Sequence, residues 1–388
     1  MKAMTLPRGR RGFTSTALAG AALVTASLLL AGCASAKSTT STVSTAAAGA
    51  ASPASAQSAG TPSPSESAAP VVASGGIFDR VLDQPSVAAT PAGFYVTWQV
   101  DSQAKTPSSV LVRADQATGR IEAMHSFSTG SITRPFAVGT SLWAMLAMSH
   151  AELLLRMDPV TLAVTGELSV SSGSFQGATY RNNQLSVAGG ALWVVGGDRL
   201  DRVSLPTMKM TKTITLPGAF SSAIAGSADG SFLIVSEANS GGQGSLQRRD
   251  PVTGALLASH PVTGVTAASL GGVVGSGAWI AEPTGMMGYV ERVSTATLAP
   301  VPGTSVEGSN GIDVAVADGV IWVSQPPGGP SDNYCADPVT GRVLARIPLP
   351  SRELDIPIAF TTQYVYYGAS ANDGYYLRRL AVPAACRV

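Results

Sequence analysis

Four side chains in the second half of the sequence carry oxygen atoms of the kind that a hard cation prefers. They are Glu237, Glu282, Asn310 and Asp313. Carboxylate and amide oxygens bind Ca²⁺ when several of them converge, and a bound cation can polarise a substrate for hydrolysis or elimination. A Ca²⁺-dependent hydrolase or lyase is therefore one hypothesis. The structural alternative is an Asn-Gly turn at 310–311 beside solvated carboxylates.

Three further side chains are candidates for ligand binding: Arg134, His150 and Asp198. His150 is the one histidine expected near a loop that could hold a ligand. The sequence has no Gly-rich phosphate loop, Gly-x-Ser-x-Gly elbow, His-Glu-x-x-His or Cys-x-x-Cys motif. With a net charge of +1 and 13% charged residues, it also lacks the basic patch expected for nucleic-acid binding. We therefore predict no catalytic residue and no required cofactor, with Ca²⁺ as the alternative.

The three cysteines, Cys33, Cys335 and Cys386, have different expected roles. Cys33 follows Leu30-Ala31-Gly32, after four cations and the 15 apolar or small residues 17–31. That order is typical of an export signal, and the apolar run is too short to span a bilayer. We expect the other two cysteines to form a disulfide outside the cytoplasm. The alternative is a pair of buried free thiols.

The N-terminal fifth of the chain is expected to be an export signal followed by a flexible tether. Residues 1–32 are predicted to be a signal peptide, exported either through an ordinary basic n-region or by the twin-arginine route, given Arg10-Arg11. Residues 33–76 begin with Cys33 and are rich in Ala, Ser, Thr, Gly and Pro. Such a segment buries too little apolar surface to offset its ordering entropy, which predicts disorder.

From residue 77 to 388 the sequence repeats a short mark, best seen as Gly190-Ala191-Leu192-Trp193. The residues equivalent to Trp193 are separated along the chain by 48, 50, 40, 46, 43 and 44 positions. The equivalent residues are Tyr95, Trp143, Trp193, Leu233, Trp279, Trp322 and Tyr366. We expect these side chains to pack in the core, and the seven positions define seven repeats.

A second mark, clearest as Asp-Pro-Val-Thr-Gly at 250–254 and 337–341, lies about twenty residues after each of the first six repeat positions. The copies at 205–207 and 294–297 keep only the threonine. Its threonines are Thr118, Thr161, Thr207, Thr253, Thr297 and Thr340. Asp can accept from nearby backbone N–H groups, Pro presets φ, and Gly adopts positive φ, so the mark predicts a hairpin turn. Each repeat then contains four strands, which in the third repeat are expected at 185–188, 192–195, 199–204 and 210–216.

Four short strands with a period in the low-to-mid forties indicate a β-propeller. We predict an all-β fold with seven four-stranded antiparallel blades. The last repeat lacks a fourth strand, so residues 77–82 are expected to supply it and close the ring. Cys335 and Cys386 then belong to neighbouring blades, where their bridge would hold the chain end.

These marks resemble the YVTN, NHL and streptogramin-lyase-like propellers of bacteria over about 77–388. Residues 30–33 resemble a lipobox, which implies that Cys33 is lipidated. Together, the repeats and the lipobox resemble those of an actinobacterial cell-surface lipoprotein. The run Ser309-Asn310-Gly311-Ile312-Asp313 is similar to the Asn-Gly entry of calcium-dependent lactonase-type propellers. The histidine pair of streptogramin lyases is missing, so the resemblance implies the architecture and leaves the activity open.

Our leading hypothesis is a monomeric, lipid-anchored extracytoplasmic propeller that binds an envelope protein or glycan and is not an enzyme. The second hypothesis is the Ca²⁺-dependent hydrolase or lyase, with its site at the mouth of the propeller. A third is an accessory subunit of an envelope complex.

Overall fold

The computed structural model describes 18 segments of the chain: residues 76–90, 92–100, 108–148, 152–170, 185–196, 198–217, 219–227, 230, 233–239, 243–263, 269–284, 287–309, 313–317, 319–324, 333–347, 357–361, 363–371 and 374–387. They belong to one compact unit, Thr61–Val388. Their regular structure is almost entirely β-strand, with two short 3₁₀ helices, η1 (Ile77–Asp79) and η2 (Ala384–Cys386). Among these residues, no helix has the length and hydropathy to cross a bilayer. Cys33 and the predicted signal peptide lie outside the described residues.

Four sheets contain four consecutive strands each, all antiparallel. The first holds β10 (Leu185–Ala188), β11 (Ala191–Gly196), β12 (Arg199–Ser204) and β13 (Met210–Thr215). The second holds β14 (Ala219–Gly226), β15 (Leu233–Asn239), β16 (Gln243–Arg249) and β17 (Leu256–Thr263). The third holds β18 (Ser269–Val274), β19 (Gly277–Thr284), β20 (Met287–Ser294) and β21 (Val306–Ser309). The fourth holds β22 (Asp313–Ala317), β23 (Val320–Ser324), β24 (Asn333–Ala336) and β25 (Val343–Ile347).

A fifth sheet has its innermost strand in two pieces. Its members are β5 (Ser131–Ile132), β6 (Phe136–Val138), β7 (Ser141–Ala147), β8 (Glu152–Met157) and β9 (Val164–Val170). Both β5 and β6 pair with β7, at its end and its start respectively. Thr133 joins the two pieces, because its hydroxyl accepts a hydrogen bond from the Met145 N–H at 3.0 Å.

The sixth sheet has seven strands, in the order β26-β27-β28-β1-β2-β3-β4. They are β26 (Pro357–Phe360), β27 (Tyr364–Ala371), β28 (Gly374–Ala381), β1 (Val81–Thr90), β2 (Gly93–Val100), β3 (Ser108–Ala114) and β4 (Ile121–Phe127). The long strand β1 pairs with β28 through Val81 and Leu82, and with β2 through residues 83–90. One sheet therefore contains both the first and the last parts of the described chain.

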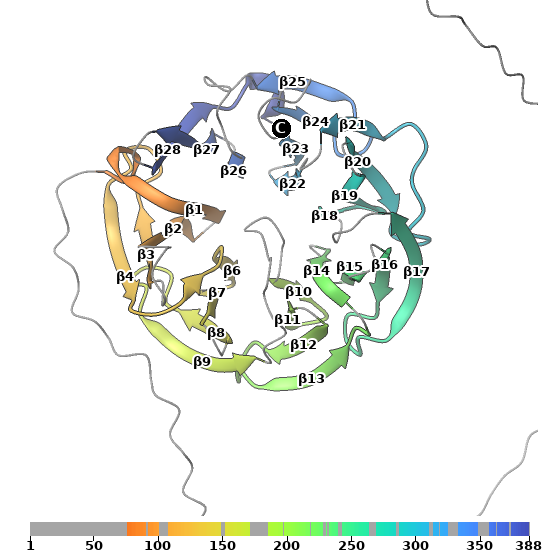
Figure 1. Ribbon diagram of the computed structural model, residues 1–388, viewed down its shortest axis with the longest axis horizontal. Helices are drawn as coiled ribbons and strands as arrows, with labels where there is room; N and C mark the ends of the chain where they lie inside the picture. The colour runs from red at the N-terminus through yellow and green to blue at the C-terminus, as the bar shows by residue number, and fades with distance from the viewer. Residues whose placement is uncertain are drawn as a thin grey trace, which may run out of the picture. The chain divides into compact units, whose positions relative to one another are not determined.

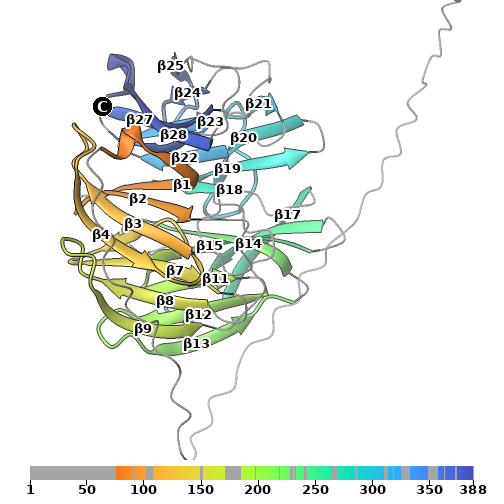
Figure 2. The same cartoon turned by 60° about the vertical axis from the view of Figure 1, so that its left-hand side comes forward.

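The sheets are arranged around a ring, with their first strands toward its centre and their last strands outside (Figures 1 and 2). Among the inner strands, β14 contacts β10 and β18, β18 contacts β22, and β1 contacts β26. This is the architecture of a β-propeller, as the sequence predicts. The predicted count of seven blades is not found, because the structure contains six hydrogen-bonded sheets. The reason is that β1 joins the first and seventh repeats into one sheet.

The predicted closing strand at 77–82 also differs from the structure. Residues 77–79 form the helix η1 and not a strand, and the pairing with β28 begins at Val81. In the third repeat, by contrast, the strands predicted at 185–188 and 199–204 are β10 and β12 with the same bounds.

The apolar core lies between neighbouring sheets. One cluster combines Tyr95 and Leu111 of the first repeat with Leu142 and Leu155 of the second. Six of the seven repeat-defining side chains, Tyr95, Trp143, Trp193, Trp279, Trp322 and Tyr366, are at most 1% exposed, which confirms that these rings pack in the core. The remaining position, in the fourth repeat, shifts by one residue. The strand pairing places Ile234, and not Leu233, in the register of the other six.

Candidate functional site

The structure brings one set of sequence-predicted residues together. Cys335 lies in β24, Cys386 lies in η2, and their sulfur atoms form a disulfide with a Cα–Cα separation of 6.0 Å. The predicted disulfide is confirmed, and the alternative of two free thiols is wrong. The bridge connects the sixth repeat to the last described residues of the seventh.

Three of the four candidate cation ligands come from three consecutive sheets. Glu237 lies in β15, Glu282 lies in β19, and Asp313 is the first residue of β22. Asp313 pairs with Ser324, the last residue of β23, so it lies at the end of its sheet where the second strand ends. Asn310 lies outside the described residues. No group of three or more His, Cys, Asp or Glu side chains in metal-binding arrangement occurs among the side chains that the structure describes.

Two of the three candidate ligand-binding residues, Arg134 and Asp198, belong to the described residues and come from different repeats. Arg134 is exposed between β5 and β6. Asp198 precedes β12 and forms an ion pair with Arg199, with 3.9 Å between Oδ1 and Nε. Both side chains of that pair are about half exposed, so water screens their attraction. His150 lies outside the described residues.

A feature that the sequence analysis missed is an arginine opposite each repeat-defining residue. The second and third strands pair Tyr95 with Arg113, Trp143 with Arg156, Trp193 with Arg202, Ile234 with Arg248, Trp279 with Arg292 and Tyr366 with Arg379. Paired residues in antiparallel strands project to the same face of the sheet. The sixth repeat differs, because Trp322 pairs with Cys335.

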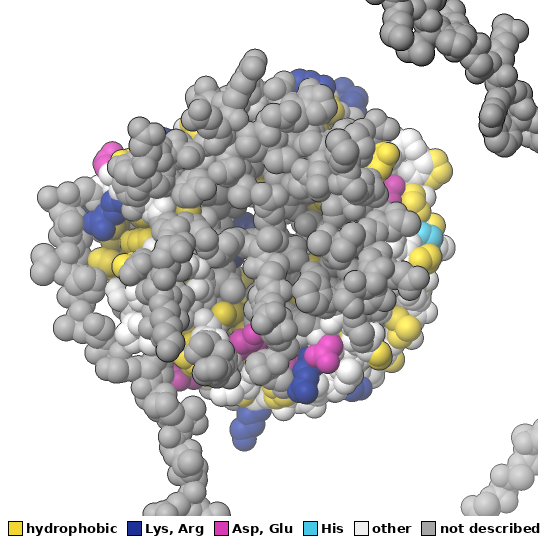
Figure 3. Space-filling view, viewed as in Figure 1, with side chains coloured by type: hydrophobic (Ala, Val, Ile, Leu, Met, Phe, Trp, Pro, Cys, Tyr) yellow, Lys and Arg dark blue, Asp and Glu magenta, His cyan; other side chains and the backbone are white. Residues whose placement is uncertain are grey.

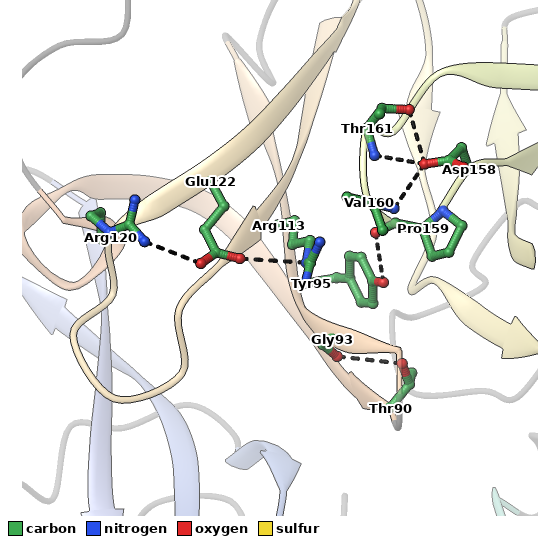
Figure 4. Close-up of polar contacts among 10 residues, drawn as sticks. All are labelled: Thr90, Gly93, Tyr95, Arg113, Arg120, Glu122, Asp158, Pro159, Val160 and Thr161. Atoms are coloured by element: carbon green, nitrogen blue, oxygen red, sulfur yellow. Dashed lines mark hydrogen bonds and ion pairs between the residues drawn. The ribbon is translucent and has the colours of Figure 1, made fainter. Parts of the chain in front are cut away.

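At five junctions these residues connect one repeat to the next by hydrogen bonds, which we call inter-repeat hydrogen bonds. The acceptor is the carbonyl oxygen of the second residue in the next hairpin turn. Tyr95 Oη donates to Pro159 at 2.9 Å (Figure 4). Trp193 Nε1 donates to Pro251 at 3.1 Å, and Trp279 Nε1 to Pro338 at 2.9 Å. Burial of the ring and a fixed acceptor together position neighbouring sheets.

Arginine supplies the donor at two other junctions. Arg248 Nη1 donates to the carbonyl of Thr295 at 3.1 Å, where the repeat-defining position is the aliphatic Ile234. Arg379 Nη1 donates to the carbonyl of Gln116 at 2.6 Å, and so connects the seventh repeat to the first. The Arg379 guanidinium also lies over the rings of Phe78 and Tyr364, at 4.9 and 4.5 Å from their centroids.

The acceptor turns share one geometry. In the turn that starts at Asp250, the carboxylate accepts from the Thr253 N–H and hydroxyl, and the Gly254 N–H donates back to the Asp250 carbonyl. Corresponding bonds occur in the turns that start at Asp115, Asp158 and Asp337. The backbone hydrogen bond to Thr253 is the main reason that the pKa of Asp250 is below its usual value. These turns confirm the hairpins that the sequence predicts.

One buried and one partly buried carboxyl group behave in the opposite way. Asp201 in β12 is 3% exposed and accepts a hydrogen bond from the Thr213 hydroxyl at 2.6 Å. Desolvation by burial raises its pKa, and the same cause raises the pKa of Glu291 in β20. In each case the next residue in the chain is the arginine that lies opposite the repeat-defining side chain, Arg202 or Arg292. Their register relative to the turn is the signal that could have identified them in the sequence.

Comparisons with known proteins bear on the architecture alone. No protein-family model matches the chain, and no curated protein matches its sequence. Among solved structures, it is similar to Kuenenia stuttgartiensis hydrazine synthase, with a TM-score of 0.52 and 12% identity, over 78% of this chain and 97% of that one. It is also similar to BamB from Moraxella catarrhalis, with a TM-score of 0.44 and 12% identity, over 77% and 95% of the two chains. A third match is the computationally designed protein Ika8, with a TM-score of 0.46, 13% identity and coverage of 78% and 98%.

At 12% identity, the hydrazine synthase match indicates a shared fold only. The chain is thus a β-propeller with a covalent bridge near its C-terminal end. Its described side chains supply structural hydrogen bonds between repeats.

Proposed function

We propose that this protein is a lipid-anchored, extracytoplasmic β-propeller that binds a partner protein. The export signal and Cys33 in the sequence support the anchor. The Cys335–Cys386 disulfide supports an oxidising compartment, because disulfides persist mainly outside the cytoplasm. The observation that favours binding is the outer strand β17.

Strand β17 differs from the other outer strands, which are the last strands of their sheets. With eight residues it is the longest of them, and it contains no Asp, Glu, Lys or Arg. The other outer strands each contain one charged residue, namely Glu122 in β4, Glu167 in β9, Lys212 in β13, Glu307 in β21 and Arg346 in β25. Charged residues on an edge strand prevent pairing with other chains, and β17 lacks that protection.

Strand β17 begins with two exposed apolar side chains. Leu256 and Leu257 are 54% and 52% exposed, and Val252 in the preceding turn is 57% exposed. Apolar side chains are visible along the rim next to β17 (Figure 3, right). Pro261 lacks an N–H, so residues 256–260 form the longest stretch of β17 in which every residue has a backbone donor. The partner that fits is an extended, uncharged protein segment that adds as a further strand.

Site-specific photo-crosslinking in the native envelope tests this function. A photoreactive amino acid replaces Leu257, and a control replaces Val160, an exposed apolar residue of a different repeat with 56% exposure. The binding function predicts an adduct from position 257 whose crosslinked residue lies in an uncharged segment, and no adduct from position 160. Equal adducts from both positions, or none from 257, would contradict it.

We also propose that the seven-stranded sheet represents two blades, so that the ring has seven. The support is that β1 pairs with β28 only through Val81 and Leu82 and then continues against β2. Val81→Pro removes an N–H at this pairing and is expected to speed hydrogen exchange in β28. Unchanged exchange in β28 would mean that the ring does not depend on this pairing for closure.

The second candidate function is the Ca²⁺-dependent hydrolase or lyase. It is favoured by the placement of Glu237, Glu282 and Asp313 in three consecutive sheets. Arg134, His150 and Asp198 are its candidate substrate contacts. Calorimetric titration with Ca²⁺ should show binding by the wild type and weaker binding by Glu237→Gln and Asp313→Asn. An absence of binding by the wild type would eliminate this candidate.

A further inference from the structure

The sixth repeat departs from the others at one register position. In the six other repeats, the residue opposite the repeat-defining side chain is an arginine. In the sixth repeat this residue is Cys335, opposite Trp322. The repeat therefore has no guanidinium at the place from which Arg248 and Arg379 bond to their neighbouring repeats.

The indole of Trp322 does not replace that donor. Its Nε1 donates to the carbonyl of Ala317, 3.3 Å away in the same repeat. The acceptor expected in the seventh repeat is the carbonyl of Val382, which lies three residues after Arg379 as Pro251 lies three residues after Arg248. That carbonyl accepts from Arg387, at 3.1 Å from Nε and 2.9 Å from Nη2. Among the described residues, the sixth-to-seventh junction thus has no inter-repeat hydrogen bond. Within the same part of the chain the second-to-third junction also has none, and there the Nε1 of Trp143 has no partner.

The disulfide supplies a covalent connection at this position. It starts at the register place of the arginine and ends at Cys386 in η2, whose N–H donates to the Pro383 carbonyl at 2.9 Å. Trp322 also stacks on Phe360 of the seventh repeat, with ring centroids 4.6 Å apart. We propose that the bridge is an oxidation-dependent lock. Residues 382–387 dock stably on the sixth repeat only after the bridge has formed, and they open in the reduced chain.

The chemistry of the lock is thiol–disulfide exchange with a small-molecule or protein disulfide as oxidant. One cysteine thiolate attacks the oxidant disulfide, forms a mixed disulfide and releases one oxidant thiol. The second cysteine thiolate then attacks the mixed disulfide, forms the internal S–S bond and releases the other oxidant thiol. The two cysteines thereby lose two electrons and two protons, and the oxidant gains them.

Burial sets the order of events. Cys335 is fully buried and Cys386 is 2% exposed, so neither sulfur can be attacked while the segment is docked. Exchange therefore takes place in the open segment, and docking afterwards protects the bond from reductants. The last repeat would complete its packing only in an oxidising compartment.

Alkylation of the reduced wild-type chain tests this order. The full chain is unfolded and reduced in urea, refolded by dilution with the reductant present, and treated with iodoacetamide. Mass spectrometry then follows the peptide that contains Cys386. We expect Cys386 of the refolded reduced chain to be alkylated at nearly the rate measured in urea. A second sample is oxidised by glutathione disulfide and freed of residual oxidant, so only the re-reduced fraction of Cys386 can react. In that sample we expect roughly hundredfold slower alkylation. Strong protection of Cys386 in the refolded reduced chain would overturn the proposal.

A variant pair provides the second test. In the Cys335→Ala/Cys386→Ala variant, hydrogen exchange should rise in residues 374–387 and stay unchanged in β10–β12. The matched control is Trp143→Phe, which weakens a different junction and should leave exchange in 374–387 unchanged. A uniform rise over all sheets in the double variant would show that the bridge has a global role and contradict a local lock.

Discussion

The ring of Trp193 occupies the space in which a side chain on Gly254 would lie. A Cβ at Gly254 would stand 2.9 Å from Cη2 of the indole and closer still to Cδ1 of Ile214, and Gly341 has the same relationship with the ring of Trp279 at 3.1 Å. Where the preceding repeat presents the smaller ring of Tyr95, the equivalent turn residue is Leu162, which is buried in the same cluster as Tyr95. Leu162 keeps a positive φ of 61°. The turn residue and the ring of the preceding repeat thus fill one shared volume.

Gly254→Ala should therefore destabilise the protein by about 1–3 kcal/mol through overlap with Ile214 and the indole of Trp193 and through the positive φ of 69°. Combination with Trp193→Tyr should cost less than the sum of the two single changes. Urea unfolding measures each free energy. The matched control is Gly190→Ala, which has a similar φ of 71° but no atom within 4 Å of the new Cβ. Equal costs at the two glycines would show that the ring does not fill this space.

The hydrogen bond from Trp193 to Pro251 can be measured against Trp143. The Nε1 of Trp143 is buried and has no hydrogen-bond partner in the structure, and both rings are almost completely buried. Trp193→Phe should lower the free energy of unfolding by about 1 kcal/mol more than Trp143→Phe, because only the first change leaves a carbonyl unpaired. Chemical denaturation of both variants supplies the comparison. A larger loss in Trp143→Phe would argue against a stabilising role for these bonds.

The raised pKa of Asp201 predicts a pH dependence of stability. The folded state binds this proton more tightly than the unfolded chain, so the group favours folding most below the ordinary carboxyl pKa. That contribution is lost as the pH rises through the folded-state pKa. Asp201→Asn should therefore be more stable than the wild type at neutral pH. The difference should shrink at about pH 4.

Asp337 serves as the control of opposite sign for that experiment. Its pKa is lowered, chiefly by the Thr340 backbone N–H, so it contributes stability above the ordinary carboxyl pKa and loses it as the pH falls. Asp337→Asn should therefore weaken the protein at neutral pH. Thermal unfolding at several pH values measures both variants, and shifts of the same sign in both would refute the assignment.

Replacement of Cys33 tests the anchor directly. Cys33→Ala removes the thiol that would carry the lipid, so the protein should move from the membrane fraction to the soluble fraction and lose incorporation of labelled palmitate. Cys335→Ala is the control, because it removes a cysteine without affecting lipidation. Retention of the label in Cys33→Ala would show that the lipid is attached elsewhere.

The repeated turns made much of the fold predictable from sequence. A turn with Asp, Thr and a positive-φ residue depends on local hydrogen bonds, so the residues themselves reveal it, and the strands on either side follow. The same turns placed Cys335 in the third strand of its repeat and made the disulfide a geometric expectation. Gly-x-aromatic marks were less exact, because the loop before the second strand varies in length. This variation explains the choice of Leu233 where the register selects Ile234.

Other features depend on contacts that no local pattern encodes. The double pairing of β1 joins residues almost 300 positions apart, from Leu82 to Tyr375, and it changed the count from seven blades to six sheets. The partners of Tyr95 and Trp193 lie 64 and 58 residues away. The arginine before each turn was visible in the sequence, but its place opposite an aromatic ring required the strand register.

The ends of the propeller are held by side chains as well as by strands, since Arg378 Nη1 donates to the Phe78 carbonyl at 2.8 Å. A gene rearranged to start at β10, with the present ends of residues 76–387 spliced by a short peptide, would thus retain every strand neighbour that we describe within the sheets. Such a permutation changes which repeat comes first in the chain. The order of the repeats around the ring stays the same, because each aromatic ring packs against the turn of one particular neighbouring repeat.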